Sequence, residues 1–374
     1  MTSRERVLCA VNHKQADRMP IDFGGSTSTG ISIFAYARLL DFFGYPKEPV
    51  EVADMIQLLP RMRMEVLQRF HSDCVMLKPD WTAVQPWSPR PGYDFLVPAS
   101  AKLIPSPDGA WTLEHRRGRL HMPARGYFFD GSWARVDERD DDAYFMATAA
   151  EAKRLYRDTD YYIGWAGFPS YFSQDPDWLC ELMLDPQAVA ARNRAALDGA
   201  KDMLLRLAAE CGDAVQEVRI ADDMGGQRGP MCRPEVMERE IMPFYKEFCD
   251  FVHENSPYKV HLHNCGSILP LIPMLADSGI DILDPIQISA ENMAPADIKK
   301  AASGKIALWG GGVDTQNILG KASPGEVVRN VRKLVDAFKP GGGYVFAAVH
   351  NIQGDVPPQN IAAVYDAAYG ASSY

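Results

Sequence analysis

The sequence has no continuous apolar run long enough to cross a bilayer. Its first residues, Met1 to Arg6, lack the apolar core of a signal peptide. It has only 7 cysteines in 374 residues. Their odd number and scattered positions exclude a disulfide framework and are typical of a reducing compartment. We therefore expect a cytoplasmic protein with no membrane partner.

Basic residues are also in short supply. The chain has 39 Lys and Arg against 49 Asp and Glu, and its formal net charge is -10. A general nucleic-acid binder needs a basic surface. We therefore expect no nucleic-acid partner.

A glycine-rich dinucleotide fingerprint is missing too, which disfavours the doubly wound open sheet that is the alternative α/β fold. Eight short, mostly apolar segments are present, each preceded by at least one helical pattern. Strands of this kind are buried on both faces of a parallel sheet, and eight such units form a closed (β/α)8 TIM-type barrel. We predict a single TIM-barrel domain over residues 1–374. The predicted strands are Met19–Phe23, Cys74–Leu77, Tyr161–Ala166, Glu217–Ala221, Tyr258–Leu262, Ile280–Leu283, Ile306–Trp309 and Tyr344–Ala348.

The segment 81–137, after the second predicted strand, has a different pattern. Short alternating runs and turns predict a β-rich insertion, with a hairpin formed by Trp111–His115 and Leu120–Met122. The insertion is either a lid over a site or a passive cover. Its aromatic residues either line a pocket or only pack; they are Trp81, Trp87, Tyr127, Phe128 and Trp133. Before the second strand, helices are predicted near Val50–Leu58 and over Pro60–Phe70.

The active site of such a barrel lies at the C-terminal ends of the strands. Polar or glycine-rich groups follow nearly every predicted strand. The catalytic candidates are Asp22, Asp222 and Asp223. The substrate-binding candidates are Lys78, Gln287, Gly311 and Asp314. Adjacent carboxylates point to opposite faces of an extended chain, so we expect only one of Asp222 and Asp223 to enter the barrel. Alternatively, these aspartates cap loops and the glycines only form a turn.

Histidine and cysteine share one strand end. In an extended chain His263 and Cys265 point the same way. His261 lies deeper on that face, either in the barrel interior or directly behind the ligands as their support. His350 follows the eighth strand and can meet them near the barrel axis. Three such ligands with a fourth position open are the catalytic form of a zinc site. Taken alone, a histidine in the position of His350 is more often a hydrogen-bonded rim residue than a metal ligand.

Several motifs together resemble the uroporphyrinogen decarboxylase superfamily, which is built on a (β/α)8 barrel. They are Ser3–Leu8, Asp17–Pro20, Asp222–Gly225, His263–Ser267, Gly311–Asp314 and His350–Gln353. The true decarboxylases of this superfamily are metal-free and carry an arginine-rich segment after the first strand. Here Asp22–Thr27 contains no arginine. The other branch contains cobalamin-dependent methyltransferases, whose zinc site uses a His-x-Cys pair and a later cysteine.

The resemblance implies a zinc-dependent methyltransferase that acts with a corrinoid (cobalamin) protein on a small-molecule methyl donor or acceptor. His350 stands where that branch has its later cysteine, which favours polarising an oxygen and hence demethylation of a small methoxylated substrate. Two alternatives stay open. One is a metal-free carboxy-lyase of the decarboxylase type, with Asp22 or Asp222 stabilising a protonated ring. The other is a non-catalytic ligand-binding barrel. A homodimer is compatible with the sequence and is not decided by it.

Overall fold

A parallel β-sheet forms the centre of the molecule. The computed structural model describes residues 1–115, 118–130 and 136–374; Trp133 lies outside this range. The sheet has the order β13-β12-β11-β10-β9-β8, and every neighbouring pair is parallel. Its strands are β8 (Gly164–Ala166), β9 (Glu217–Ala221), β10 (Lys259–His263), β11 (Ile282–Asp284), β12 (Ala307–Trp309) and β13 (Tyr344–Val345). The order follows the sequence, so each connection returns the chain to the next position in the sheet.

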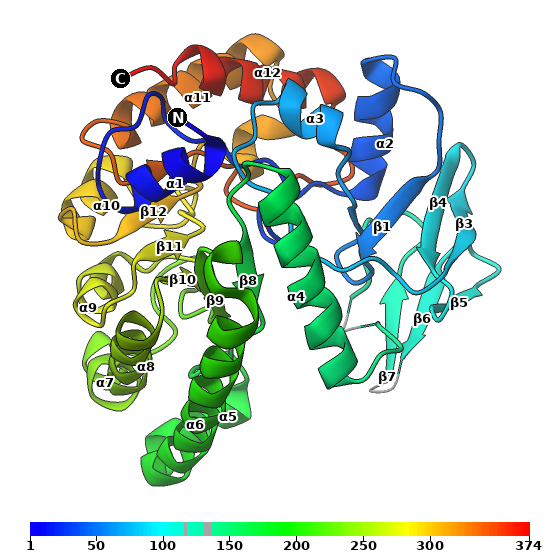
Figure 1. Ribbon diagram of the computed structural model, residues 1–374. Helices are drawn as coiled ribbons and strands as arrows, with labels where there is room; N and C mark the ends of the chain where they lie inside the picture. The colour runs from blue at the N-terminus through cyan, green and yellow to red at the C-terminus, as the bar shows by residue number, and fades with distance from the viewer. Residues whose placement is uncertain (116–117, 131–135) are drawn as a thin grey trace.

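Helices make these connections and surround the strands (Figure 1). A parallel pair needs a long crossover, and a helix supplies it while burying its own apolar face. The outer helices are α4 (Asp141–Asp158), α5 (Pro176–Leu184), α6 (Pro186–Cys211), α7 (Pro234–Glu240), α8 (Met242–Asn255), α9 (Ile272–Asp277), α10 (Pro295–Ala302), α11 (Pro324–Phe338) and α12 (Pro358–Gly370). The predicted α/β class with a parallel sheet is confirmed. None of the helices in the described ranges is long and apolar enough to span a membrane.

The first two predicted strands are represented by single parallel bridges at the two edges of this sheet. Ile21 bridges Phe346 just after β13, and Cys74 bridges Tyr162 just before β8. Helices α1 (Ser3–Val11), α2 (Ile33–Phe42) and α3 (Met64–Arg69) accompany these segments. Closure of eight strands into a barrel, the single-domain assignment and the insertion bounds 81–137 stay predictions.

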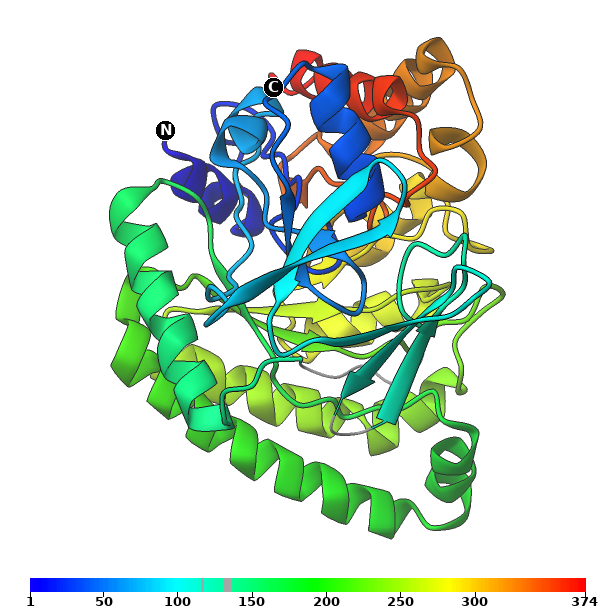
Figure 2. The same ribbon diagram turned by 90° about the vertical axis from the view of Figure 1, so that its right-hand side faces the viewer.

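A β-rich layer lies to one side of the parallel sheet in Figure 1 and faces the viewer in Figure 2. It contains β3 (Val84–Arg90), β4 (Tyr93–Pro98), β5 (Lys102–Pro105), β6 (Trp111–His115) and β7 (Gly118–Met122). Strands β6 and β7 pair as the antiparallel hairpin that the sequence predicts. Strand β4 also pairs with β1 (Val50–Asp54), which pairs in turn with β2 (Leu59–Pro60). The layer therefore extends beyond the segment after the second predicted strand.

The helix predicted near Val50–Leu58 is wrong, because residues 50–54 form β1. Val50 and Val52 are buried on one side, as the alternation Val-Glu-Val allows, and Val50 pairs with Phe95 of β4. Valine is stiff at χ1 and fits a pleated surface well. Pairing with a strand more than forty residues away thus overrides the local helical pattern.

One buried carboxylate ties the N-terminal helix to the first two strand segments. Asp73 is fully buried and accepts hydrogen bonds from Arg6 Nη1 at 2.6 Å, Arg18 Nη1 at 2.8 Å and the Ile21 amide at 2.9 Å. Ser3 Oγ of α1 donates a further bond at 2.8 Å. This charge is well satisfied. Arg6 also pairs with Asp17, whereas Arg18 has no other carboxylate partner among the described residues.

We expect Asp73→Asn to destabilise the protein strongly. Removing one partner of a buried ion pair leaves the other charge uncompensated, at a cost of about 3–5 kcal/mol. The control is Asp366→Asn, which breaks the exposed pair with Arg69 and should cost about 0–1 kcal/mol. Urea denaturation measures both changes. Equal losses in the two variants would contradict a special role for Asp73.

Candidate metal centre

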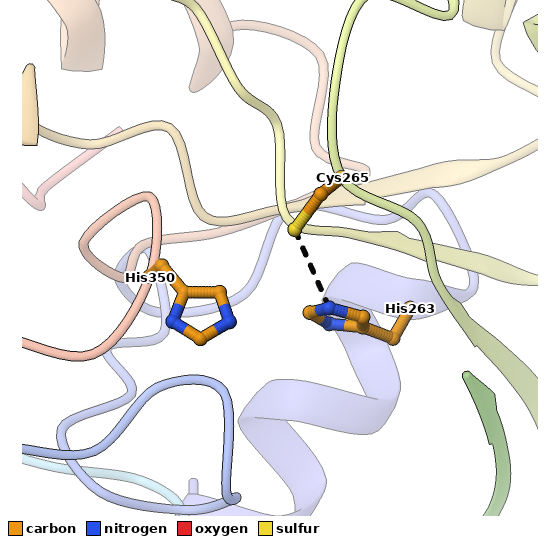
Figure 3. A group of neighbouring side chains, drawn as sticks. All are labelled: His263, Cys265 and His350. Atoms are coloured by element: carbon orange, nitrogen blue, oxygen red, sulfur yellow. Dashed lines mark hydrogen bonds between the residues drawn. The ribbon is translucent and has the colours of Figure 1, made fainter. Parts of the chain in front are cut away.

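Three side chains from two separate strand ends meet at one point. Strand β10 ends at His263, and Cys265 lies two residues further on; His350 follows β13 by five residues. Ligand atoms of His263, Cys265 and His350 all lie within 4.8 Å of one another. Figure 3 shows the cysteine sulfur and the two imidazole rings facing a common space. The convergence that the sequence predicts is therefore present.

The donor atoms are one sulfur and two nitrogens. Cys265 Sγ lies 3.5 Å from His263 Nε2, and the rings of His263 and His350 lie 5.6 Å apart at 77°. A thiolate with imidazoles is a donor set that selects zinc over hard cations such as Mg²⁺ or Ca²⁺. Three protein ligands leave one position for a substrate atom, as in catalytic zinc sites.

Asp284, the last residue of β11, orients His263. Its Oδ2 lies 3.4 Å from His263 Nδ1 and accepts a hydrogen bond from Ser28 Oγ at 2.8 Å. Burial alone would raise the pKa of Asp284, but hydrogen bonds to His261 and His263 hold this pKa well below its usual range. A charged carboxylate at Nδ1 turns Nε2 toward Cys265, which is how carboxylate–histidine pairs prepare a metal ligand.

The loop that carries Cys265 is fixed by side chains from neighbouring strand ends. The Cys265 amide donates to Asp223 Oδ1 at 2.8 Å, and the Gly266 amide donates to Gln287 Oε1 at 2.8 Å. Burial, then the charges of Asp223 and Asp284, raise the pKa of the Cys265 thiol. A bound divalent cation reverses this balance, because it stabilises a coordinating thiolate outright.

His350 is suited to ligate a metal in its neutral form. Burial, and then the neighbouring His263, lower the pKa of His350 to about 4. Its imidazole is therefore unprotonated at neutral pH. Neutral imidazole is the form that binds metals.

A cavity of about 400 Å³, which we call the main cavity, is lined by two of the three residues, His263 and His350. Its walls include His263, His350, Asp223, Asp284 and Arg219. A volume of this size is typical of a small-molecule site. The cavity therefore gives the open coordination position access to a small ligand.

A second cavity, of about 240 Å³, lies on the other side of His350. It shares His350 and Gln57 with the first, and Tyr127 and Phe128 line it. Two of the aromatic residues of the predicted insertion thus line a cavity. Trp81 instead donates from Nε1 to the Val52 carbonyl at 2.7 Å, and Trp87 is buried. Trp87 therefore belongs to the packing of the β-rich layer, whereas Trp81 also lines a separate small pocket.

Of the predicted catalytic carboxylates, only Asp223 lines the main cavity. Asp22 is buried below it and accepts from Trp309 Nε1 at 2.9 Å and from the Gly25 amide at 2.7 Å. Asp222 is buried against Tyr245 of α8, whose hydroxyl donates to it. Burial raises the pKa of Asp22 to about 6 and that of Asp222 to about 7. The geometry places both outside the cavity wall, and only one of the adjacent pair enters it, as the alternation requires.

The predicted substrate-binding residues are dispersed. Lys78 pairs with Asp54 at 3.3 Å in a separate small pocket, and Gln287 supports the Cys265 loop. Gly311 turns at φ +70° with no room for a side chain against Ile286. Asp314 caps the short helix η3 (Thr315–Leu319) by accepting from the amides of residues 316 and 317. None of these four residues lines the main cavity, because each has a role in local structure.

Sequence reasoning missed the polar groups below the ligands. The main cavity is also lined by Asp284, Ser28, Gln57 and Arg219. Glu217 forms an ion pair with Arg219, and its Oε2 lies 3.0 Å from His261 Nδ1. One signal was available, because Asp284 follows the predicted strand Ile280–Leu283 directly. His261 is only 1% exposed, in agreement with its predicted interior position.

Two glycines let the loops after β9 and β10 touch. Gly266 has φ +96°, and a Cβ there would overlap the Gly225 carbonyl oxygen. A Cβ on Gly225 would lie 2.7 Å from the Cys265 carbonyl oxygen. Only glycine fits this contact. It keeps the loop of Asp223 against the loop of Cys265.

Comparison with known proteins gives a consistent family. Residues 171–370 match the family model of uroporphyrinogen decarboxylase (URO-D). A uroporphyrinogen decarboxylase from Pseudoalteromonas atlantica is 27% identical over 194 residues, 50% of each chain. One from Sodalis glossinidius is 41% identical over 63 residues, 17% of each chain. The longer match thus spans about half the length of that relative.

A solved structure is similar over nearly the whole chain. A methyltransferase from Methanosarcina mazei superposes with a TM-score of 0.56, covering 99% of both chains at 15% sequence identity. At this identity the likeness shows the fold.

We expect Gly266→Ala to destabilise the protein, because both its backbone angle and its contact with Gly225 exclude a side chain. The left-handed φ alone costs about 1–3 kcal/mol for a non-glycine residue. Gly229→Ala is the control, since Gly229 lies in a neighbouring loop with no atom within 4 Å of its added Cβ. Urea denaturation compares the two. A Gly266→Ala protein as stable as Gly229→Ala would show that the loops do not depend on this contact.

Proposed function

The chain belongs to the uroporphyrinogen decarboxylase (URO-D) family, and within it we propose a zinc-dependent methyltransferase that acts with a corrinoid protein. The proposed reaction demethylates a small methoxylated substrate. The observation that carries the proposal is the group of His263, Cys265 and His350, whose ligand atoms lie within 4.8 Å beside a cavity.

The chain's own residues fit a zinc ion. Asp284 holds His263 with Nε2 directed toward Cys265, His350 is neutral, and Cys265 is a partly buried thiol that a cation would convert to thiolate. These are the deprotonated forms that zinc ligation requires. When bound, zinc would supply Lewis-acid polarisation of a substrate oxygen.

The cavity supports the rest of the reaction. Apolar side chains of Phe168 and Ile220 line its wall and exclude water from a bound ligand. Demethylation breaks the bond between the methyl carbon and the ether oxygen, and the bonding pair stays on oxygen. The methyl group passes to the second substrate, the reduced corrinoid of a partner protein, which supplies the electron pair for the new bond.

The metal-free decarboxylase is less well supported by the geometry. Asp22 and Asp222, its candidate groups, are buried outside the cavity and hydrogen-bonded to the protein. The segment 22–27 has no arginine for substrate carboxylates. A non-catalytic ligand-binding barrel would keep the cavity and show neither chemistry.

We also propose that the parallel sheet closes into a (β/α)8 barrel. Four backbone hydrogen bonds support this. The Phe346 amide donates to Pro20 at 2.9 Å, the Asp22 amide to Phe346 at 2.7 Å, the Asp73 amide to Ile21 at 2.6 Å and the Val75 amide to Tyr162 at 3.2 Å. The segments near residues 21 and 74 would then be the first two strands, linking β13 to β8.

We expect purified protein loaded with zinc to retain about one ion per chain by elemental analysis. Cys265→Ser should abolish stoichiometric retention, because the thiolate ligand is lost. Asp284→Asn should weaken zinc binding by about 10–100-fold, since it removes the group that orients His263. The controls are Cys180→Ser, an exposed cysteine, and Asp314→Asn, the helix cap. Wild-type protein that binds no zinc, or Cys265→Ser protein that binds it normally, would remove the metal centre from this proposal.

We expect zinc-loaded protein to methylate free cob(I)alamin from at least one of a panel of methoxylated compounds. Absorbance spectroscopy follows the corrinoid, and Cys265→Ser should lose the activity while Cys180→Ser keeps it. Release of CO₂ from a porphyrinogen without zinc would favour the decarboxylase instead. Ligand binding with neither reaction would favour the non-catalytic barrel.

A further inference from the structure

Arg219 occupies a prepared place in the wall of the main cavity. It lies on β9 two residues after Glu217, so both side chains point to the same face of the sheet. Gly164 of the neighbouring strand β8 pairs with Glu217, and a Cβ there would overlap Glu217 Oε1 and lie 2.8 Å from Arg219 Nε. The glycine leaves room for a buried ion pair between Arg219 and Glu217.

One edge of the Arg219 guanidinium is occupied and the other is not. Nε donates to Glu217, whereas neither Nη1 nor Nη2 has a hydrogen-bond acceptor among the described residues. The Arg219 side chain is only 12% exposed, and Glu217 is its sole ion-pair partner in the described parts of the chain. These two nitrogens are not among the fully buried unpaired atoms of the described residues, so they reach the cavity, where a ligand with suitable acceptors would bind them.

Glu217 is shared between Arg219 and two other groups. It also accepts from the Tyr162 hydroxyl at 2.9 Å and lies 3.0 Å from His261 Nδ1. Although burial would raise the pKa of Glu217, Arg219 and then His261 lower it to about 2. Asp22 and Asp284 also lie close enough to stabilise the charge of Arg219. What Arg219 offers a ligand is therefore the unoccupied edge formed by Nη1 and Nη2.

We propose that Arg219 is a specificity-determining residue that binds the carboxylate of the substrate through Nη1 and Nη2. A guanidinium fork matches a planar carboxylate with two parallel hydrogen bonds. Arg219 shares the cavity with His263 and His350, and Phe168 and Ile220 supply apolar wall. A fitting ligand is a small carboxylic acid whose reacting oxygen lies at the end remote from the carboxylate. That this ligand is a methoxylated acid rests on the proposed function; that it carries a carboxylate does not.

The test measures binding and is independent of methyl transfer. Zinc-free and zinc-loaded protein are titrated calorimetrically with 4-methoxybenzoate and with the neutral 4-methoxybenzamide. The wild type should bind the carboxylate at least about tenfold more tightly than the amide. Arg219→Gln should reduce this preference to less than twofold, and Arg219→Lys should retain part of it, because a lysine keeps the charge and loses the fork.

Two further variants keep the result interpretable. The double variant Glu217→Gln with Arg219→Gln removes both charges of the pair, so it avoids the unpaired glutamate that could unfold Arg219→Gln; it too should lose the preference. Lys78→Gln removes a positive charge outside the cavity and should retain it. The proposal is overturned when the wild type shows no preference for the carboxylate, or when the double variant keeps it.

The outcomes separate this inference from the proposed function. Carboxylate selectivity that depends on Arg219 in a protein without zinc or methyl transfer supports the inference and refutes the function. Methyl transfer with equal use of acid and amide does the reverse.

Discussion

The candidate metal centre depends on the buried carboxylate of Asp284. Its Oδ2 lies 3.4 Å from His263 Nδ1, 3.7 Å from His261 Nε2 and 2.8 Å from Ser28 Oγ. These groups come from β10 and from the loop after the Ile21 segment, so one oxygen joins parts of the chain that are distant in sequence. The carboxylate keeps its charge in a dry site because its donors outweigh burial. A fixed charge at Nδ1 leaves Nε2 of His263 as the atom presented to the cavity.

A network of buried charged groups on β9, β10 and β11 adjoins this centre. Arg219 pairs with Glu217, Glu217 contacts His261, and His261 approaches Asp284. Buried charges are tolerated when each of them has a partner. Removing one partner leaves an unpaired buried charge, which destabilises the fold. The orientation of a metal ligand and the position of the cavity's arginine therefore belong to one network.

The sequence identifies the parts of the site that local geometry decides. His263 and Cys265 follow from the side-chain alternation of an extended segment, and no tertiary information is needed. His350 required the order of the strands, because its distance from the pair in sequence says nothing about its distance in space. Arg219 and Glu217 were missed because the predicted strand 217–221 was treated as apolar, although its polar residues occupy alternating positions that share one face.

Some sequence patterns leave the direction of a side chain or the type of element undetermined. Asp22 and Asp222 follow strands as predicted, but a strand-end position does not tell whether a carboxylate turns to the cavity, to Trp309 or to Tyr245. At residues 50–54 the alternating valines are compatible with a strand, but only pairing with the distant strand β4 decides between strand and helix. Both kinds of information reside in tertiary contacts.

His350 stands where the methyltransferase branch of the superfamily has a cysteine, and this difference sets the charge of the proposed centre. One thiolate cancels only half of the charge of a divalent zinc ion, and the two imidazoles cancel none, since burial keeps His350 neutral. A centre with residual positive charge polarises an oxygen more strongly and activates a bound thiolate less than one with two thiolates. Arg219 adds a second positive group to the same cavity. The proposed zinc centre and Arg219 together favour a ligand with an oxygen at the metal and a negative charge at its other end. An uncharged, apolar ligand would use neither group.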